Sequence, residues 1–126
     1  MPVAYKIDSQ FRVVFCRAWD VLTDSDLLEC QRQISEDPDF APDMNQLFDF
    51  SDVKSVELTS SGIRTLAYRN PFGSNAKRAF SVEPGAMAMF GMMRMFEILT
   101  GEHPDELRVQ FNDLKSARAW LGLPEE

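Results

Sequence analysis

The sequence predicts an α/β domain with the element order β-β-α-β-α-β-α-β-α and a mainly parallel sheet with an antiparallel N-terminal hairpin strand. Short β-branched and aromatic runs alternate with longer segments of helical apolar spacing, which implies crossovers between parallel strands. Only Asp8-Ser9-Gln10, typical turn residues, separates the first two strand-like runs, so these form a hairpin. The length of 126 residues, without a break in composition, predicts one domain over residues 1–126.

Each element has its own local pattern. We expect strands at residues 4–8, 11–19, 46–51, 77–82 and 107–111. We expect helices at residues 24–34, 59–68, 84–100 and 113–121. Thr23 or Asp24 caps the first helix, which places Leu27, Cys30 and Ile34 on one face.

The later elements begin and end at similar signals. The hydroxyls of residues 59–61 cap the second helix, and residues 53–58 before it are expected to form a turn. Pro84-Gly85 begins the third helix, and Gly101 suits its C-terminal cap. Asn112 or Asp113 caps the last helix.

Composition and charge narrow the class of protein. With 44% hydrophobic and 26% charged residues, the chain has the composition of an ordinary globular domain. Its formal net charge of -7 disfavours nucleic acid as a partner. The N-terminus lacks the pattern of a secretion signal, and no apolar run reaches the roughly 18 residues of a membrane span. We therefore expect a cytoplasmic protein without an integral membrane segment.

No pattern of catalytic or metal-binding residues stands out. Cys16 and Cys30 lack CxxC spacing, so two buried thiols are favoured over a redox or metal pair. The single histidine, His103, is expected in an exposed loop. Asp49 and Asp52 flank a strand end, where aspartates commonly hold turns. We expect a protein that is not an enzyme and that uses no cofactor and no metal.

Five segments carry a resemblance to a known family. They are residues 47–53, 59–62, 90–97, 109–111 and 117–121. With them, most of the chain resembles the SpoIIAA-like branch of the STAS fold, which is related in topology to the lipid-carrying CRAL-TRIO domain. The resemblance implies a bacterial cytosolic binding protein, names no ligand and adds no catalytic residue.

The same resemblance marks Ser60 as a phosphoacceptor candidate. STAS-type antagonists of anti-sigma factors carry Asp-Ser-Ser-Gly at the start of the second helix, where a partner kinase phosphorylates the first serine. Ser60 matches that serine and Gly62 is in register, while Thr59 stands in place of the aspartate. A phosphate at a helix N-terminus meets unpaired N–H groups. The alternative is that these hydroxyls only cap the helix.

The third helix, residues 84–100, is apolar nearly all round and rich in methionine. Three interpretations stay open: a core helix, a homodimer face, or the wall of a pocket for a small apolar or lipid-like ligand. Interface or ligand-binding candidates are Met87, Phe90, Met93 and Arg94, with Phe72 as a loop aromatic that anchors its loop or closes a pocket. An ion pair of Arg94 with Glu97 is the simpler role for that arginine.

These patterns predict a non-catalytic regulatory or protein-interaction module of STAS-like type that self-associates as a homodimer or binds a protein partner. The alternative is binding or sensing of a small apolar or lipid-like ligand. A phosphoserine switch at Ser60 is a further, weaker hypothesis.

Overall fold

The computed structural model describes residues 2–73, 75–82, 87–100, 107–111 and 114–124. The strands are β1 (Val3–Asp8), β2 (Val13–Thr23), β3 (Asn45–Glu57), β4 (Arg78–Val82) and β5 (Leu107–Phe111). The helices are α1 (Asp24–Glu36), α2 (Ser60–Tyr68), α3 (Met87–Thr100) and α4 (Leu114–Trp120). The elements follow one another in the predicted order.

The described strands form one mixed sheet in the spatial order β1-β2-β3-β4-β5. Strands β1 and β2 pair antiparallel, with Val3 opposite Ala18 and Asp8 opposite Val13. Every later neighbour pairs in parallel. The predicted mainly parallel sheet with an antiparallel N-terminal hairpin is therefore confirmed.

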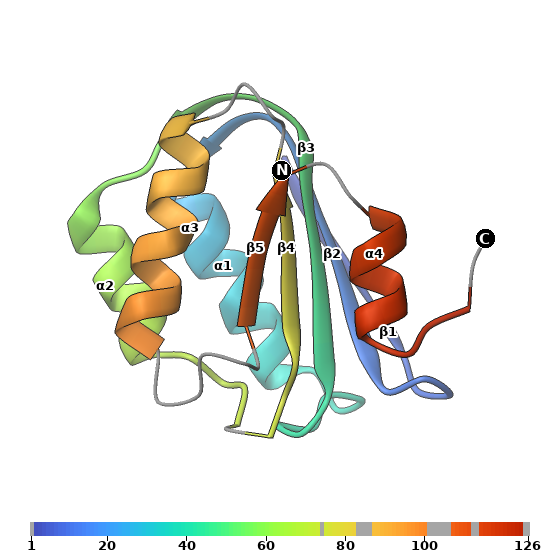
Figure 1. The fold of residues 1–126 in the computed structure, drawn as a ribbon. Helices are drawn as coiled ribbons and strands as arrows, with labels where there is room; N and C mark the ends of the chain where they lie inside the picture. The colour runs from blue at the N-terminus through green and yellow to red at the C-terminus, as the bar shows by residue number, and fades with distance from the viewer. Residues whose placement is uncertain (1, 74, 83–86, 101–106, 112–113, 125–126) are drawn as a thin grey trace.

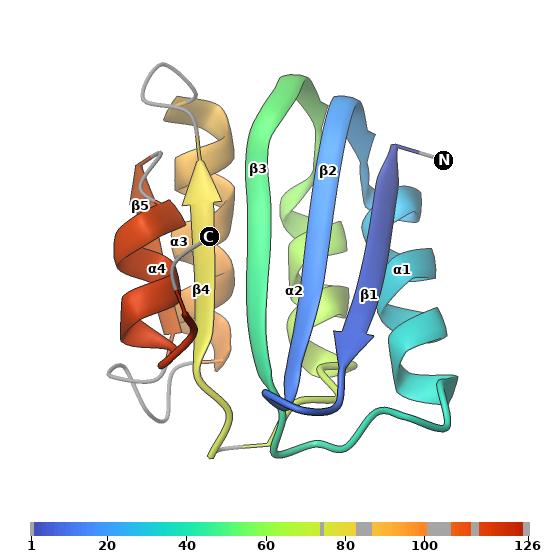
Figure 2. The same cartoon turned by 90° about the vertical axis from the view of Figure 1, so that its right-hand side faces the viewer.

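The helices divide unequally between the two faces of the sheet. Helices α1, α2 and α3 lie on one face and α4 lies on the other (Figure 1). Seen from the α4 side, α4 lies over the half of the sheet that contains β4 and β5 (Figure 2), and it contacts β3 and β4. The larger hydrophobic core consequently lies under α1, α2 and α3, and a smaller one lies under α4. The smaller core contains the buried residues Val13, Leu47, Ala79, Ala117, Leu121 and Leu123.

The turn expected at residues 53–58 is wrong, because β3 continues to Glu57. Strand β2 also extends further than expected, and the two strands stay paired as far as Thr23 opposite Glu57. Their pairing shifts register twice along the way, and Asp20 at the second shift has a φ of 58°. The C-terminal parts of β2 and β3 are held by backbone pairing between segments that are distant in the sequence. The local hydrophobic pattern therefore does not predict that the strands extend this far.

Threonine caps begin the first two helices. Thr23 accepts a hydrogen bond from the backbone of Asp26, whose carboxylate accepts one from the Thr23 backbone, so the two form a capping box. Thr59 Oγ1 accepts from Gly62 N at 3.0 Å at the start of α2. The expected helix start at Pro84-Gly85, the cap at Asn112 or Asp113, and His103 lie outside the described residues.

Candidate ligand-binding site

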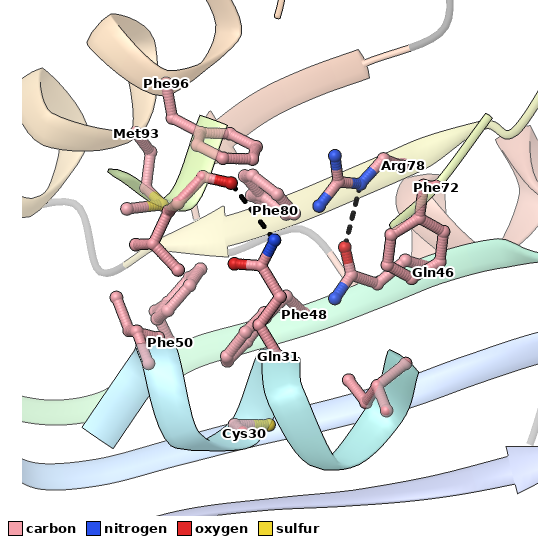
Figure 3. Close-up of a pocket in the computed structure, with 13 residues that line it drawn as sticks. Cys30, Gln31, Gln46, Phe48, Phe50, Phe72, Arg78, Phe80, Met93 and Phe96 are labelled. Atoms are coloured by element: carbon pink, nitrogen blue, oxygen red, sulfur yellow. Dashed lines mark hydrogen bonds between the residues drawn. The ribbon is translucent and has the colours of Figure 1, made fainter. Parts of the chain in front are cut away.

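A hollow lies between the sheet and the three helices on its larger-core side. Its cavity volume is about 40 Å³, and the empty space in and around it, which includes open solvent, is about 450 Å³. The lining residues are Leu27, Cys30, Gln31, Ile34, Gln46, Phe48, Phe50, Leu66, Phe72, Arg78, Phe80, Met93 and Phe96 (Figure 3). Most of them are aliphatic or aromatic, as in ligand pockets generally.

The hollow follows from the periodicities of its walls. On the strands, alternation sends Gln46, Phe48 and Phe50 of β3 to the same face as Arg78 and Phe80 of β4. The parallel pairing then sets Gln46 opposite Arg78 and Phe48 opposite Phe80. The two polar residues, Gln46 and Arg78, are therefore neighbours, and the aromatic pair Phe48 and Phe80 follows them along the two strands.

Helical spacing supplies the opposite walls. Leu27, Cys30 and Ile34, predicted to share one face of α1, are all buried and all line the hollow. From α3, Met93 and Phe96 lie one turn apart and close the third side. Gln31 spans from α1 to α2, because its Nε2 donates to the carbonyl of Leu66 at 3.0 Å.

Arg78 is the most unusual residue of the hollow, because it is a cation that is only 7% exposed. Its Nε donates to Gln46 Oε1 at 2.9 Å, and its Nη1 donates to Asn70 Oδ1 at 3.0 Å. Both acceptors are neutral amides, and no described carboxylate forms an ion pair with this guanidinium. A guanidinium has five N–H donors, so three have no acceptor among the described residues.

Three aromatic rings pack around the guanidinium of Arg78. Its central carbon lies 4.4 Å from the ring centroid of Phe72, 4.9 Å from that of Phe96 and 5.5 Å from that of Phe80. Rings at these distances attract a cation through their quadrupole. Burial lowers the pKa of Arg78 to about 9, so the side chain is still charged at neutral pH.

The two cysteines lie near Gln46, the glutamine that accepts from Arg78. Both are buried and free, as predicted. Gln46 Nε2 donates to Cys16 Sγ at 3.3 Å. Burial raises the pKa of Cys16, so this thiol is neutral at pH 7. Gln46 is thus held between Arg78 and Cys16, with its amide orientation set by both.

The predicted site residues separate into two groups. Phe72 and Met93 both line the hollow, and Phe72 is buried with its ring edge-on to Phe40 at 5.1 Å between centroids. Met87 is 65% exposed, and Phe90 is half-buried against the larger core. Neither lies among the lining residues.

The two charged or phosphorylatable candidates also lie away from the hollow. Arg94 is exposed and pairs with Glu97 one turn along α3, as predicted for its simpler role. Ser60 is exposed at the first position of α2, directly after the capping Thr59. Its phosphorylation therefore stays a prediction.

The third helix is both core and pocket wall. Met89, Met93 and Phe96 are its buried residues, while Leu99 is exposed. The helix turns about 100° per residue, so a face centred on Met93 cannot also include Leu99.

Sequence reasoning missed Arg78 and Gln46. One signal was present: Arg78 lies two residues before Phe80 in a strand expected to belong to the core, so alternation places both on one face. Their partnership across two strands depends on sheet register, which the sequence does not display.

No protein-family model matches the chain, and no curated protein matches it.

Among the described residues, no group of three or more His, Cys, Asp and Glu side chains is placed to hold a metal ion. Within the same ranges, none of the helices combines the length and the hydrophobicity that crossing a membrane requires.

Proposed function

We propose that the chain is a non-catalytic binding domain of STAS-like type that holds a small apolar molecule in the hollow between the sheet and α1, α2 and α3. The observation that carries the proposal is the lining itself: nine of the described lining residues are aliphatic, aromatic or methionine side chains. The element order and mixed sheet agree with the resemblance to SpoIIAA-like proteins.

The size of the hollow sets how a ligand is accommodated. The cavity volume of about 40 Å³ is well below the roughly 150 Å³ of an engineered cavity that takes up benzene. A ligand therefore also occupies the solvent-open part, and the wall adjusts around it. Met93 suits this role, because methionine is unbranched and repacks at low cost. Its helix also carries Met89, Met92 and Met95, which pack on the same core.

The test is to fill the hollow with a larger side chain. In the wild-type protein, 1-octanol at roughly ten times its dissociation constant should raise the melting temperature by about 5 °C. Met93→Trp should abolish this increase, because the indole ring occupies the ligand's space. The control is Met87→Trp on the exposed side of the same helix, which should keep the increase. Differential scanning calorimetry measures all three.

Two negative results together would contradict the proposed binding of an apolar molecule. If 1-octanol and shorter alcohols leave the wild-type melting temperature unchanged, and native mass spectrometry of gently purified protein reveals no bound mass, the proposal is wrong.

A second candidate function is self-association. Met87, Ile98 and Leu99 are exposed on α3, and Tyr68 is exposed at the end of the neighbouring α2. Exposed large apolar side chains lose contact with water when another protein covers them, which favours association. This candidate is compatible with ligand binding, since these side chains are outside the hollow.

A further inference from the structure

We propose that the molecule held in the hollow is a small apolar monocarboxylate whose carboxylate pairs with the guanidinium of Arg78. This inference rests on the proposed function, and it adds the charge and the chemical class of the ligand. Figure 3 places Arg78, Gln46 and Gln31 around one part of the hollow, with aromatic rings beside them.

The first argument is charge balance. Burying an ion is costly unless an opposite charge accompanies it. Arg78 is nine-tenths buried or more, and the described part of the chain supplies it with two neutral amide oxygens and no carboxylate. Among the lining residues there is also no acid that could compete with an incoming anion. A bound carboxylate would supply an opposite charge that no described residue provides.

The second argument is geometry. The protein uses Nε and one Nη1 donor of Arg78 and leaves Nη2 without an acceptor among the described residues. Gln46 and Asn70 hold the guanidinium on two sides, while Phe72 and Phe96 hold it over their rings. The group is thus oriented before any ligand arrives, which lowers the entropic cost of binding. A planar guanidinium with free donors matches a planar carboxylate.

The third argument selects the class of anion. One guanidinium balances one negative charge, and the two glutamines beside it are neutral. Phosphate carries more than one charge at neutral pH and would need further donors or cations. Beyond the polar group, the walls are aromatic and aliphatic. A monocarboxylate with a short hydrocarbon body satisfies both halves of the hollow.

A purely structural role for Arg78 would give a different result. In that case its hydrogen bonds to Gln46 and Asn70 would serve only to join β3, β4 and the loop at Asn70. Ligand charge would then have no effect on affinity. The test therefore compares two ligands of equal chain length that differ in charge.

The experiment is isothermal titration calorimetry at pH 7.5 with octanoate, 1-octanol and inorganic phosphate. For the wild-type protein, octanoate should bind roughly 10- to 100-fold more tightly than 1-octanol, which is the effect expected of a charged hydrogen bond. Arg78→Met should remove this preference and leave the affinity for 1-octanol within about threefold. Arg78→Lys keeps the positive charge and should therefore retain part of the preference for octanoate over 1-octanol.

Arg94→Met is the matched control, because Arg94 is a solvent-exposed arginine outside the hollow. It should bind both ligands as the wild type does. A further measurement needs no variant: the Nε–H nuclear magnetic resonance signal of Arg78 should shift with octanoate and stay in place with 1-octanol. It decides the matter if Arg78→Met does not fold.

The outcomes separate the two proposals. Equal affinity for octanoate and 1-octanol would overturn the carboxylate inference and leave the apolar pocket intact. Failure of both ligands to bind would overturn both proposals. If phosphate binds as tightly as octanoate, the inferred class of anion is wrong. If Arg94→Met loses octanoate binding and Arg78→Met does not, the inferred residue is wrong.

Discussion

Tyr5 connects the edge strand β1 to the end of α1 through its hydroxyl group, which lies 3.3 Å from the carbonyl oxygen of Gln33 as well as near Asp37. Its hydroxyl donates to Asp37 Oδ2 at 2.8 Å, and Asp37 is the C-cap residue of α1. Burial, followed by this hydrogen bond, raises the pKa of Tyr5 to about 12. The folded protein therefore holds the phenol in its protonated form more strongly than the unfolded chain does, whose tyrosine pKa is about 10.

We predict that Tyr5→Phe lowers the free energy of unfolding at pH 8 by about 1 kcal/mol, because Asp37 loses its donor. Since the folded pKa is the higher one, this contribution is complete below pH 10 and is lost as the pH rises from about 10 to 12. Urea unfolding of both proteins across this range measures it. Tyr68→Phe is the control, because Tyr68 is 91% exposed and should give no change. A difference that persists unchanged at pH 12 would contradict the assignment.

At the level of elements, the starts of α1 and α2 are joined by one carboxylate. Asp24 accepts hydrogen bonds from Thr59 N at 3.0 Å and from Thr59 Oγ1 at 2.6 Å. A Cβ on Gly62 would overlap that carboxyl group. Gly62, which matches the glycine of the family motif, is therefore needed here for the close approach of Asp24. The same carboxylate lies at the helix end beside Ser60, where a phosphate would meet a second negative charge.

We predict that Gly62→Ala destabilises the fold by about 1–3 kcal/mol, because Asp24 must give up its bonds to Thr59. In the Asp24→Ala background the same change should cost much less, so the double-mutant cycle should be clearly non-additive. Gly91→Ala is the control. Nothing lies within 4 Å of its added Cβ, and alanine at this helix position should stabilise by about 0.5–1 kcal/mol. Additive costs in chemical denaturation would argue against the clash.

At the level of the whole molecule, the two sides of α3 both carry apolar side chains, and each side belongs to a different candidate function. The hollow takes up Met93 and Phe96 from one side of α3, and the other side presents Ile98, which is 71% exposed, and Leu99. One helix thus serves the proposed ligand site and the proposed contact surface. A ligand that repacks Met93 would change the same helix that a partner contacts, which gives the two candidate functions a physical connection.

We predict that Ile98→Lys weakens self-association, because a charged side chain replaces exposed apolar area at the contact. Light scattering coupled to size-exclusion chromatography, over a range of concentrations, measures the mass. Phe11→Lys, at the exposed turn between β1 and β2, is the control and should associate as the wild type does. A strict monomer at every concentration in the wild type would contradict the self-association candidate.

The sequence by itself determined the order of strands and helices, limited the first two helix caps to residues 23–24 and 59–61, and predicted the buried face of α1. These features follow from local chemistry: turn residues, capping hydroxyls and the 3.6-residue period act over a few neighbouring positions. The burial of both cysteines followed in the same way from their apolar surroundings.

Only the tertiary structure decided where the candidate site lies. Gln46 and Arg78 are 32 residues apart and meet because β3 and β4 pair in one particular register. The length of β3 and the exposure of Leu99 also depend on partners elsewhere in the chain. That Arg78 is buried with no carboxylate partner among the described residues is a property of the assembled walls, since burial and charge balance are defined only once distant segments have packed together.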